Sequence, residues 1–223
     1  MHILAFDTET TGLPDWKQPS EAEHQPHLVE ICGLLYNMDS LELVDSYHTL
    51  IKPDGWTIPD DIAAIHGITT ERAIAEGVPE AEALAKFLQL HDRCDLRVAH
   101  NQSFDARILR IAIKRFGAGH DQETRDAAAD LFKLAPAYCT CNAAKPIMRL
   151  RATEAMRRTG RGGWFKPPTL QEAHQHFVGV PFEGAHSARA DAEACARVYF
   201  ALQQLETGRR ETDDRRKEEP VRV

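Results

Sequence analysis

The chain has 223 residues, 43% hydrophobic and 27% charged, which is enough for one globular domain, or two small ones, around a buried core. Its formal net charge of −7 excludes a protein that binds polyanions over its whole surface, although a local basic patch or bound cations could still serve a nucleic acid. An odd number of cysteines, no zinc-binding spacing, no signal segment and no membrane-spanning run together predict a soluble cytoplasmic protein that binds no membrane.

The first expected element is a strand over residues 2–6, a short apolar run of the length typical of a buried strand. Asp7 and Glu9 continue it, and their i, i+2 spacing places both carboxylates on one side of the strand. Thr10 and Thr11 open the turn that follows. Two adjacent like charges repel each other, and a hard divalent cation would turn that repulsion into coordination. A polar strand end that meets water explains this stretch equally well.

After an exposed loop over residues 15–27, two further strands are expected at 28–38 and 42–52, and the three form an antiparallel meander. Helical periodicity and capping residues, such as Ser103 at an expected N-cap, predict the elements that follow. These are helices over 59–65, 79–90, 103–116, 126–134, 169–177 and 187–204, and short strands over 96–100 and 137–140. The pattern favours a mixed α/β sheet covered by helices in a domain over residues 1–206, followed by a disordered charged tail over 207–223.

Three further polar residues fall where chemistry is possible. Asp105 and Asp191 each lie in the first turn of an expected helix, where the helix dipole alone would favour an acid by ~0.3–1 kcal/mol. His186 lies in the loop before the last helix, where a single histidine is usually a surface residue. If the strand and the two helix starts meet at one edge of the sheet, four carboxylates gather there and two divalent cations would neutralise them. A histidine beside them is suited to accept a proton from water.

Four short stretches combine these residues in a recognisable way. They are Asp-Thr-Glu-Thr-Thr-Gly at 7–12, Ile-His-Gly-Ile-Thr at 65–69, His-Asn-Gln-Ser-Phe-Asp at 100–105 and His-Ser-Ala-Arg-Ala-Asp at 186–191. In order and separation they are similar to the motifs of the DEDDh 3′–5′ exonucleases, a family of the RNase H-like superfamily that includes proofreading subunits of bacterial DNA polymerase III. The resemblance covers residues 1–205.

This resemblance implies a fold, a cofactor and a set of roles. The fold is an RNase H-like mixed five-stranded sheet, with the second strand antiparallel, flanked by helices. Two divalent cations, Mg²⁺ or Mn²⁺, are bound by Asp7, Glu9, Asp105 and Asp191, and His186 is the general base. The residues expected near the terminal nucleotide are Thr10, Thr11, His66, Asn101 and Phe104. For Asn101 the alternative is an amide that only caps a loop.

A basic insertion at about 145–168 departs from the compact pattern of this family. Residues 145–166 carry a single acid, Glu154, and seven cations, which are Lys145, Arg149, Arg151, Arg157, Arg158, Arg161 and Lys166. Trp164 and Phe165 could stack on bases, so we expect this segment, and Arg157, Arg158 and Arg161 in particular, to guide single-stranded nucleic acid toward the site. The alternative is a solvated charged helix.

The expected function is a metal-dependent 3′–5′ exonuclease that acts on DNA, preferentially single-stranded or frayed, and releases nucleoside 5′-monophosphates. The expected partners are the 3′-terminal strand itself and, for a separate subunit, a DNA polymerase or a replication or repair complex. One alternative is a 3′–5′ exoribonuclease, because the motifs do not separate DNA from RNA. Another is an inactive accessory or binding subunit, which the presence of all five site residues disfavours.

Overall fold

Five strands form one mixed sheet, in the order β3-β2-β1-β4-β5. The strands are β1 (His2–Thr10), β2 (Leu28–Asn37), β3 (Leu43–Leu50), β4 (Leu96–Ala99) and β5 (Ala137–Cys139). The computed structural model describes residues 1–118 and 121–218. β2 is antiparallel to both β1 and β3, whereas β4 and β5 run parallel to β1, so the sheet predicted from the sequence is confirmed.

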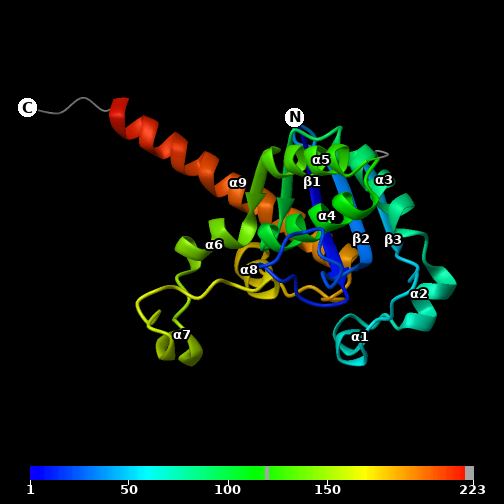
Figure 1. Ribbon diagram of the computed structural model, residues 1–223. Coiled ribbons are helices and arrows are strands. Elements are labelled where there is room, and N and C mark those ends of the chain that lie inside the picture. The colour runs from blue at the N-terminus through cyan, green and yellow to red at the C-terminus, as the bar shows by residue number, and fades with distance from the viewer. Residues whose placement is uncertain (119–120, 219–223) are drawn as a thin grey trace, which may run out of the picture.

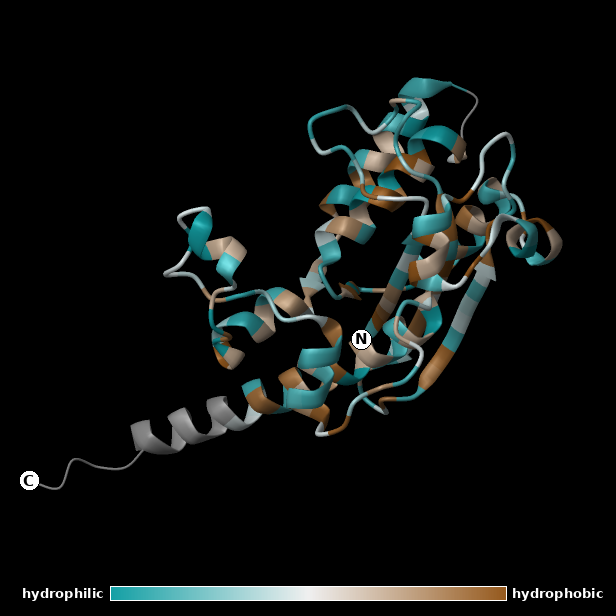
Figure 2. Cartoon of the chain, turned by 90° about the horizontal axis from the view of Figure 1, so that it is seen from below, coloured by the Kyte–Doolittle hydropathy of each residue, from teal (hydrophilic) through white to brown (hydrophobic). Residues whose placement is uncertain are grey.

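Helices cover both faces of this sheet (Figure 1). They are α1 (Asp60–His66), α2 (Thr70–Glu76), α3 (Glu80–His91), α4 (Gln102–Phe116), α5 (Gln122–Leu134), α6 (Thr140–Met148), α7 (Glu154–Arg158), α8 (Leu170–Val178) and α9 (Ala188–Glu218). Helices α3, α4 and α5 lie on one face, and α9, with α8 beside it, lies on the other. Seen from below, hydrophobic residues gather on the strands and on the helix faces that pack against them (Figure 2).

The apolar start of β1 is buried on both sides because of this double cover. Ile3 and Ala5 point toward α9, whereas Leu4 and Phe6 point toward α3 and α4, and none of the four is exposed to solvent. Successive side chains of a strand alternate between faces, so Asp7 and Glu9 lie on the α9 side at the carboxyl end of β1. The fold therefore delivers both carboxylates from a rigid, fully packed strand.

Two helix starts differ from the sequence expectation. Helix α4 begins at Gln102, and its N-cap is Asn101 in a left-handed conformation (φ 62°), so the prediction of Ser103 as the cap is wrong. Helix α5 begins at Gln122, earlier than the expected Asp126, because the side chain of Asp121 accepts a hydrogen bond from the backbone N–H of Thr124 at 2.7 Å.

Helix α6 has no counterpart among the expected elements. Pro146 lies inside it, and a proline in a helix interior costs stability because it removes a backbone donor and crowds the preceding turn. The apolar side of α6 compensates through Ala144, which is fully buried against Ala173 of α8 and Val198 of α9. Tertiary packing thus overrides the local signal.

The last helix is longer than the sequence indicated. An end near Gln204 and a disordered tail from Thr207 were expected, whereas α9 continues to Glu218, so that prediction is wrong as far as residue 218. The added stretch is rich in Glu, Arg and Lys, which favour helix, and Gly208 is its one glycine before Pro220. Residues 219–223 of the expected tail lie outside the described residues.

The loop over residues 15–27 is more firmly held than an exposed loop. Gln25 is 1% exposed, and its side-chain amide donates to the carbonyl oxygens of Asp15 and Pro19, both at 2.9 Å. The guanidinium of Arg115 on α4 donates to four carbonyl oxygens of the same loop. No helix in the described part of the chain is long and apolar enough to cross a membrane.

Candidate active site

Four carboxylates from three elements meet at the carboxyl end of β1. Asp7 and Glu9 come from the strand itself, Asp105 from the first turn of α4 and Asp191 from the first turn of α9. Their charges act on one another, since the pKa of each β1 carboxyl is raised by both Asp105 and Asp191. The structure thus brings together the four acids that the sequence singled out.

Asp105 is fixed to β1 by hydrogen bonds. Its Oδ1 accepts from the backbone N–H of Thr8 at 3.1 Å and from the Thr8 hydroxyl at 2.8 Å. Thr8 faces the α4 side of the sheet, opposite to Asp7 and Glu9, so Asp105 approaches the strand end from the other face. Only 3% of Asp105 is exposed, and its position therefore depends on this contact.

Asp191 and His186 are coupled through the backbone. The His186 N–H donates to Asp191 Oδ2 at 3.1 Å, and His186 itself has a left-handed conformation (φ 67°) that turns the loop before α9. The imidazole is exposed to solvent. One ligand atom each of Glu9, His186 and Asp191 lie within 4.8 Å of one another. The loop histidine therefore stands beside the acids, as a group that accepts a proton from water must.

A fifth carboxylate, that of Glu30, was not singled out from the sequence. Glu30 lies directly across from Glu9 in the β1–β2 register and is 4% exposed. Its Oε2 accepts from the backbone N–H of Ala188 at 2.8 Å, and its Oε1 lies 2.6 Å from Nε2 of His48. The available signal was an acid inside the otherwise apolar run of β2, which a buried strand accommodates only when the acid has partners.

Burial and mutual repulsion raise the pKa of each of the four acids that the sequence singled out. For Asp7 burial acts first, followed by the charges of Asp105, Asp191 and Glu9, and its pKa lies well above the usual range. Burial, with Asp191 and Glu30 next, raises the pKa of Glu9 to about 8. Burial also raises the pKa of Asp105 to about 7 and that of Asp191 to about 6, the latter opposed by the His186 N–H. The ionised cluster therefore requires a compensating positive charge.

The donor atoms at this site fit hard divalent cations. The four acids offer carboxylate oxygens, which are the ligands that Mg²⁺ and Mn²⁺ take, whereas softer metals take thiolates. Oδ1 of Asp191 is buried and has no hydrogen-bond partner in the described part of the chain, although such an atom normally has one. A bound cation would satisfy this oxygen and relieve the repulsion in the same step.

The comparison with protein families assigns the chain. Residues 4–199 match the family model RNase_T, described as Exonuclease. The chain belongs to this exonuclease family. Its members hydrolyse phosphodiester bonds at strand ends, in agreement with the expectation from the four motifs.

Curated relatives of this exonuclease are much longer than the chain itself. The DNA polymerase III PolC-type of Thermotoga petrophila is 38% identical over 118 residues, which is 51% of this chain and 7% of that protein. The DNA polymerase III PolC-type of Thermotoga maritima is 36% identical over 118 residues, with the same two shares. The similar stretch thus spans a small part of each polymerase.

Solved structures share the fold of this exonuclease. A zinc-bound E. coli ExoI–ssDNA complex superposes with a TM-score of 0.62 at 20% identity, covering 93% of this chain and 41% of that one. Exonuclease I of Methylocaldum szegediense gives a TM-score of 0.62 at 19% identity, covering 91% of this chain and 40% of that one. The chain spans about two-fifths of these proteins, and at this level of identity the likeness concerns the fold.

Thr10 and Thr11, two of the expected substrate residues, form hydrogen bonds within the exonuclease at the turn that follows β1. The Thr10 hydroxyl donates to the Gly12 carbonyl at 2.7 Å, and Thr11 Oγ1 accepts from the His27 N–H at 3.0 Å. His66 ends α1 next to the Thr10 backbone, with its Nδ1 accepting from the Ile68 N–H at 3.1 Å. Contact with a nucleotide remains a prediction for Thr10, Thr11 and His66.

Asn101 and Phe104 lie at the start of α4. Asn101 is exposed, and its side chain makes no capping hydrogen bond, so an amide that caps this loop is not what the structure contains. Phe104 is half-buried against the core between the sheet and α4, and its N–H donates to the Asn101 carbonyl at 2.8 Å. Contact with substrate remains a prediction for both.

Arg157, Arg158 and Arg161 are not brought to the carboxylates. They belong to α7 and the turn after it, which stand away from the sheet on the side where β1 ends (Figures 1 and 2). Arg158 forms an ion pair with Glu154, and Arg161 donates from Nε to the Thr159 hydroxyl at 3.2 Å. Contact of these arginines with substrate remains a prediction.

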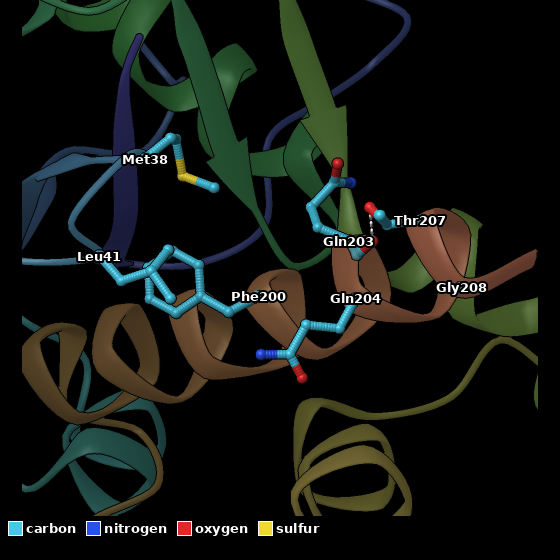
Figure 3. Close-up of a pocket in the computed structure, with 7 residues that line it drawn as sticks. All are labelled: Met38, Leu41, Phe200, Gln203, Gln204, Thr207 and Gly208. Carbon is cyan, nitrogen blue, oxygen red and sulfur yellow. Dashed lines mark hydrogen bonds between the residues drawn. The ribbon is translucent and has the colours of Figure 1, made fainter. Parts of the chain in front are cut away.

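A hollow of about 430 Å³ lies between α9 and the β2–β3 connection, and Figure 3 shows Met38, Leu41 and Phe200 facing one another in it. This hollow is at the opposite end of the sheet from the acids, because His2 pairs with Asn37 whereas Glu9 pairs with Glu30. None of the described side chains that line it is titratable, and it takes no part in the chemistry considered below.

Proposed function

We propose that this chain hydrolyses DNA from its 3′ end, with preference for single-stranded or frayed ends, and releases nucleoside 5′-monophosphates. The observation that carries the proposal is the meeting of Asp7, Glu9, Asp105 and Asp191 at one strand end beside His186. DNA is favoured because the curated relatives are DNA polymerases and the similar exonuclease I structures include complexes with DNA oligonucleotides. The polymerase relatives also favour a place beside a DNA polymerase or in a repair complex.

The proposed cofactor is a pair of Mg²⁺ or Mn²⁺ ions held by the same four acids. When bound, two such ions neutralise the phosphodiester, activate a water and stabilise the leaving oxygen. The buried Oδ1 of Asp191, which has no partner in the described residues, and the raised pKa of Glu9 support this requirement for positive charge.

The chain's own residues supply position and proton transfer. Asp7 and Glu9 are held by a strand packed on both faces, and the two bonds from Thr8 hold Asp105. The His186 imidazole accepts the proton of the attacking water at a ring nitrogen, since its exposed position allows the proton to pass to solvent. The backbone at the Thr10 turn supports the last nucleotide. This division of roles makes each acid essential.

The experiment is a degradation assay on a 5′-labelled strand, which resolves shortening from the 3′ end. Single-stranded DNA, a duplex with a mismatched 3′ end and RNA of the same sequence are compared with Mg²⁺, with Mn²⁺ and with chelator. We expect stepwise shortening of DNA that chelator abolishes. Faster cleavage of RNA would move the assignment to an exoribonuclease, and activity that survives chelation would contradict the metal requirement.

Replacing Asp7 tests the site itself. Asp7→Asn keeps the size of the side chain but removes a ligand charge, so we expect cleavage to fall by about a thousandfold or more, the scale of losing a central group of such a site. Because the same change removes a repelling charge, the melting temperature of Asp7→Asn measured with chelator should be at least as high as that of the parent. Asp39→Asn, at an exposed turn, is the matched control. Retained cleavage by Asp7→Asn would overturn the site assignment.

A further inference from the structure

A second pocket lies on the basic insertion, apart from the carboxylates. It has a volume of about 260 Å³, and its lining includes Arg149, Arg151, Arg157, Trp164 and Phe165. We call it the arginine–tryptophan pocket. Trp164 is 62% exposed and Phe165 is 41% exposed, so both rings are open to a ligand. Cations and aromatic rings thus line one hollow. The segment around α7 that carries it protrudes from the molecule (Figure 1).

The insertion that carries this pocket is a closed structure. The Lys166 N–H donates to the Leu150 carbonyl at 3.0 Å, which joins the two ends of the stretch over residues 150–166. Within it, the Arg161 N–H donates to the Met156 carbonyl at 2.8 Å and turns the chain back after α7. A Cβ at Gly162 would lie 3.3 Å from Cγ of Arg157, so this glycine allows the turn to pack against the arginine stem.

Among the described residues, Arg151 and Arg157 lack the acidic partners that two neighbouring cations have. Arg158 pairs with Glu154, and Lys166 pairs with Glu172, so these two charges are compensated. Arg151 and Arg157 form no ion pair with any residue of the described chain. Their positive charge therefore remains available on a chain whose net charge is −7. A merely solvated helix would not need to concentrate its unpaired charges around one hollow.

We propose that the arginine–tryptophan pocket binds one nucleotide of a single strand upstream of its 3′ end. The guanidinium groups of Arg151 and Arg157 contact the phosphates, since the planar fork of arginine matches a phosphate, and the base stacks on Trp164. Lys145, whose Nζ lies 5.7 Å from the centre of the Trp164 ring, positions that ring at the edge of the pocket through a cation–π contact. The inference rests on the proposed function, because that function places a strand at the end of β1.

The proposal narrows the set of arginines expected to contact the strand. Of the three expected there, Arg157 lines the pocket, whereas Arg158 is paired and Arg161 bonds to Thr159. An acidic protein segment would also attract guanidinium groups, but it would not use the exposed indole ring as a stacking platform. A single-stranded nucleic acid uses both features, and so it is the ligand the pocket favours.

The test measures binding as a function of strand length. Labelled oligothymidylates of increasing length are titrated by fluorescence anisotropy against the chain carrying Asp7→Asn, which keeps the probes intact. In this background we compare Trp164→Ala, Trp164→Phe and the double variant Arg151→Gln with Arg157→Gln. Arg93→Gln, an exposed cation paired with Asp45, is the matched control for the loss of one charge.

We expect the Kd of the parent to drop at the length where the strand reaches the pocket, and that drop to vanish in Trp164→Ala and in the double variant. For long strands the affinity of Trp164→Ala should be about tenfold lower than that of the parent, the scale of one stacked base, whereas the affinity of Trp164→Phe should be close to that of the parent. The slope of log Kd against log salt should fall by about 1.4 in the double variant, from two phosphate contacts on a single strand.

Three outcomes would overturn the proposal. The first is a length dependence of Kd that the variants leave unchanged, and the second is an equal loss of affinity at every length. The third is an oligoglutamate peptide that competes equally well for the chain, which would point to an acidic protein as the ligand. Failure of the proposed function is seen separately, as absence of 3′-end cleavage by the unmodified chain. The two failures are therefore distinguishable.

Discussion

Glu30 joins three parts of the site through one side chain. It lies opposite Glu9 on β2, accepts the N–H of Ala188 at the first residue of α9, and contacts His48 of β3. A buried carboxylate costs stability unless its oxygens are hydrogen-bonded, and both oxygens of Glu30 have such partners. Because α9 begins two residues after His186, Glu30 sets the position of the helix start that presents both His186 and Asp191.

We predict that Glu30→Gln lowers kcat and leaves KM nearly unchanged. The amide keeps the shape of the side chain but weakens the bond to the Ala188 N–H, and a loss of about 1.4 kcal/mol corresponds to about tenfold in rate. Steady-state cleavage of a single-stranded oligonucleotide separates the two constants. Glu42→Gln, an exposed acid before β3, is the matched control, and a parental kcat in Glu30→Gln would show that Glu30 does not position the site.

At the residue scale, predictability follows from spacing. Asp7 and Glu9 could be recognised because the period of a strand fixes their common face, and the resemblance to a family supplied Asp105 and Asp191. Glu30 could not, because its importance depends on the register that places β2 beside β1, which no local pattern encodes.

Helix α8 illustrates how local chemistry sets an element. Thr169 and Glu172 form a capping box, in which the Thr169 hydroxyl accepts from the Glu172 N–H at 3.2 Å and the Glu172 carboxylate accepts from the Thr169 N–H at 2.8 Å. Lys166 pairs with the same carboxylate at 2.5 Å. The start of α8 is thereby linked to the last residue of the basic segment.

We predict that Thr169→Ala lowers the free energy of unfolding by about 1 kcal/mol, the usual cost of removing an N-cap hydroxyl. Urea unfolding followed by circular dichroism measures this change. Ser103→Ala is the control, because Ser103 lies in the first turn of α4 without capping it, and its replacement should be nearly neutral. Equal losses in the two variants would contradict the assignment of Thr169 as the N-cap of α8 and of Ser103 as a residue that does not cap α4.

At the element scale, strands and capped helices could be predicted from the sequence, and elements made by tertiary contacts could not. The caps and periodicity of α8 are local, so its position was evident within a residue or two. Helix α6 depends on the burial of Ala144 against α8 and α9, and the loop at 15–27 depends on Arg115 of α4. Neither partner is adjacent in sequence.

At the scale of the whole molecule, the carboxylates gathered at one end of the sheet repel one another. Burial and neighbouring acids raise the pKa of Glu9 from 4.5 to about 8, and burial raises that of Asp105 to about 7. A carboxyl whose pKa is higher in the folded chain binds its proton more tightly there. Its stabilising effect is complete below the unfolded pKa and is lost as the pH rises through the folded value.

We therefore predict that the melting temperature measured with chelator falls between about pH 4.5 and about pH 8, the window bounded by the unfolded and folded pKa values of Glu9. Magnesium should raise the melting temperature more at the upper end of this range than at the lower end, because only ionised carboxylates bind it. Differential scanning fluorimetry with Mg²⁺ and with chelator checks this, with Asp7→Asn expected to reduce the difference. Parallel melting curves across the range would contradict it.

The hydrogen bond from Lys166 to Leu150 has a consequence for how such an enzyme can diversify. It joins the two ends of the stretch between these residues, while the four carboxylates of the candidate site lie on β1, α4 and α9. A short turn of another sequence could therefore bridge Leu150 and Lys166 without shifting the sheet, since closing a loop between adjacent ends costs little. Strand capture and bond cleavage would then be separately interchangeable modules, open to recombination and to engineering.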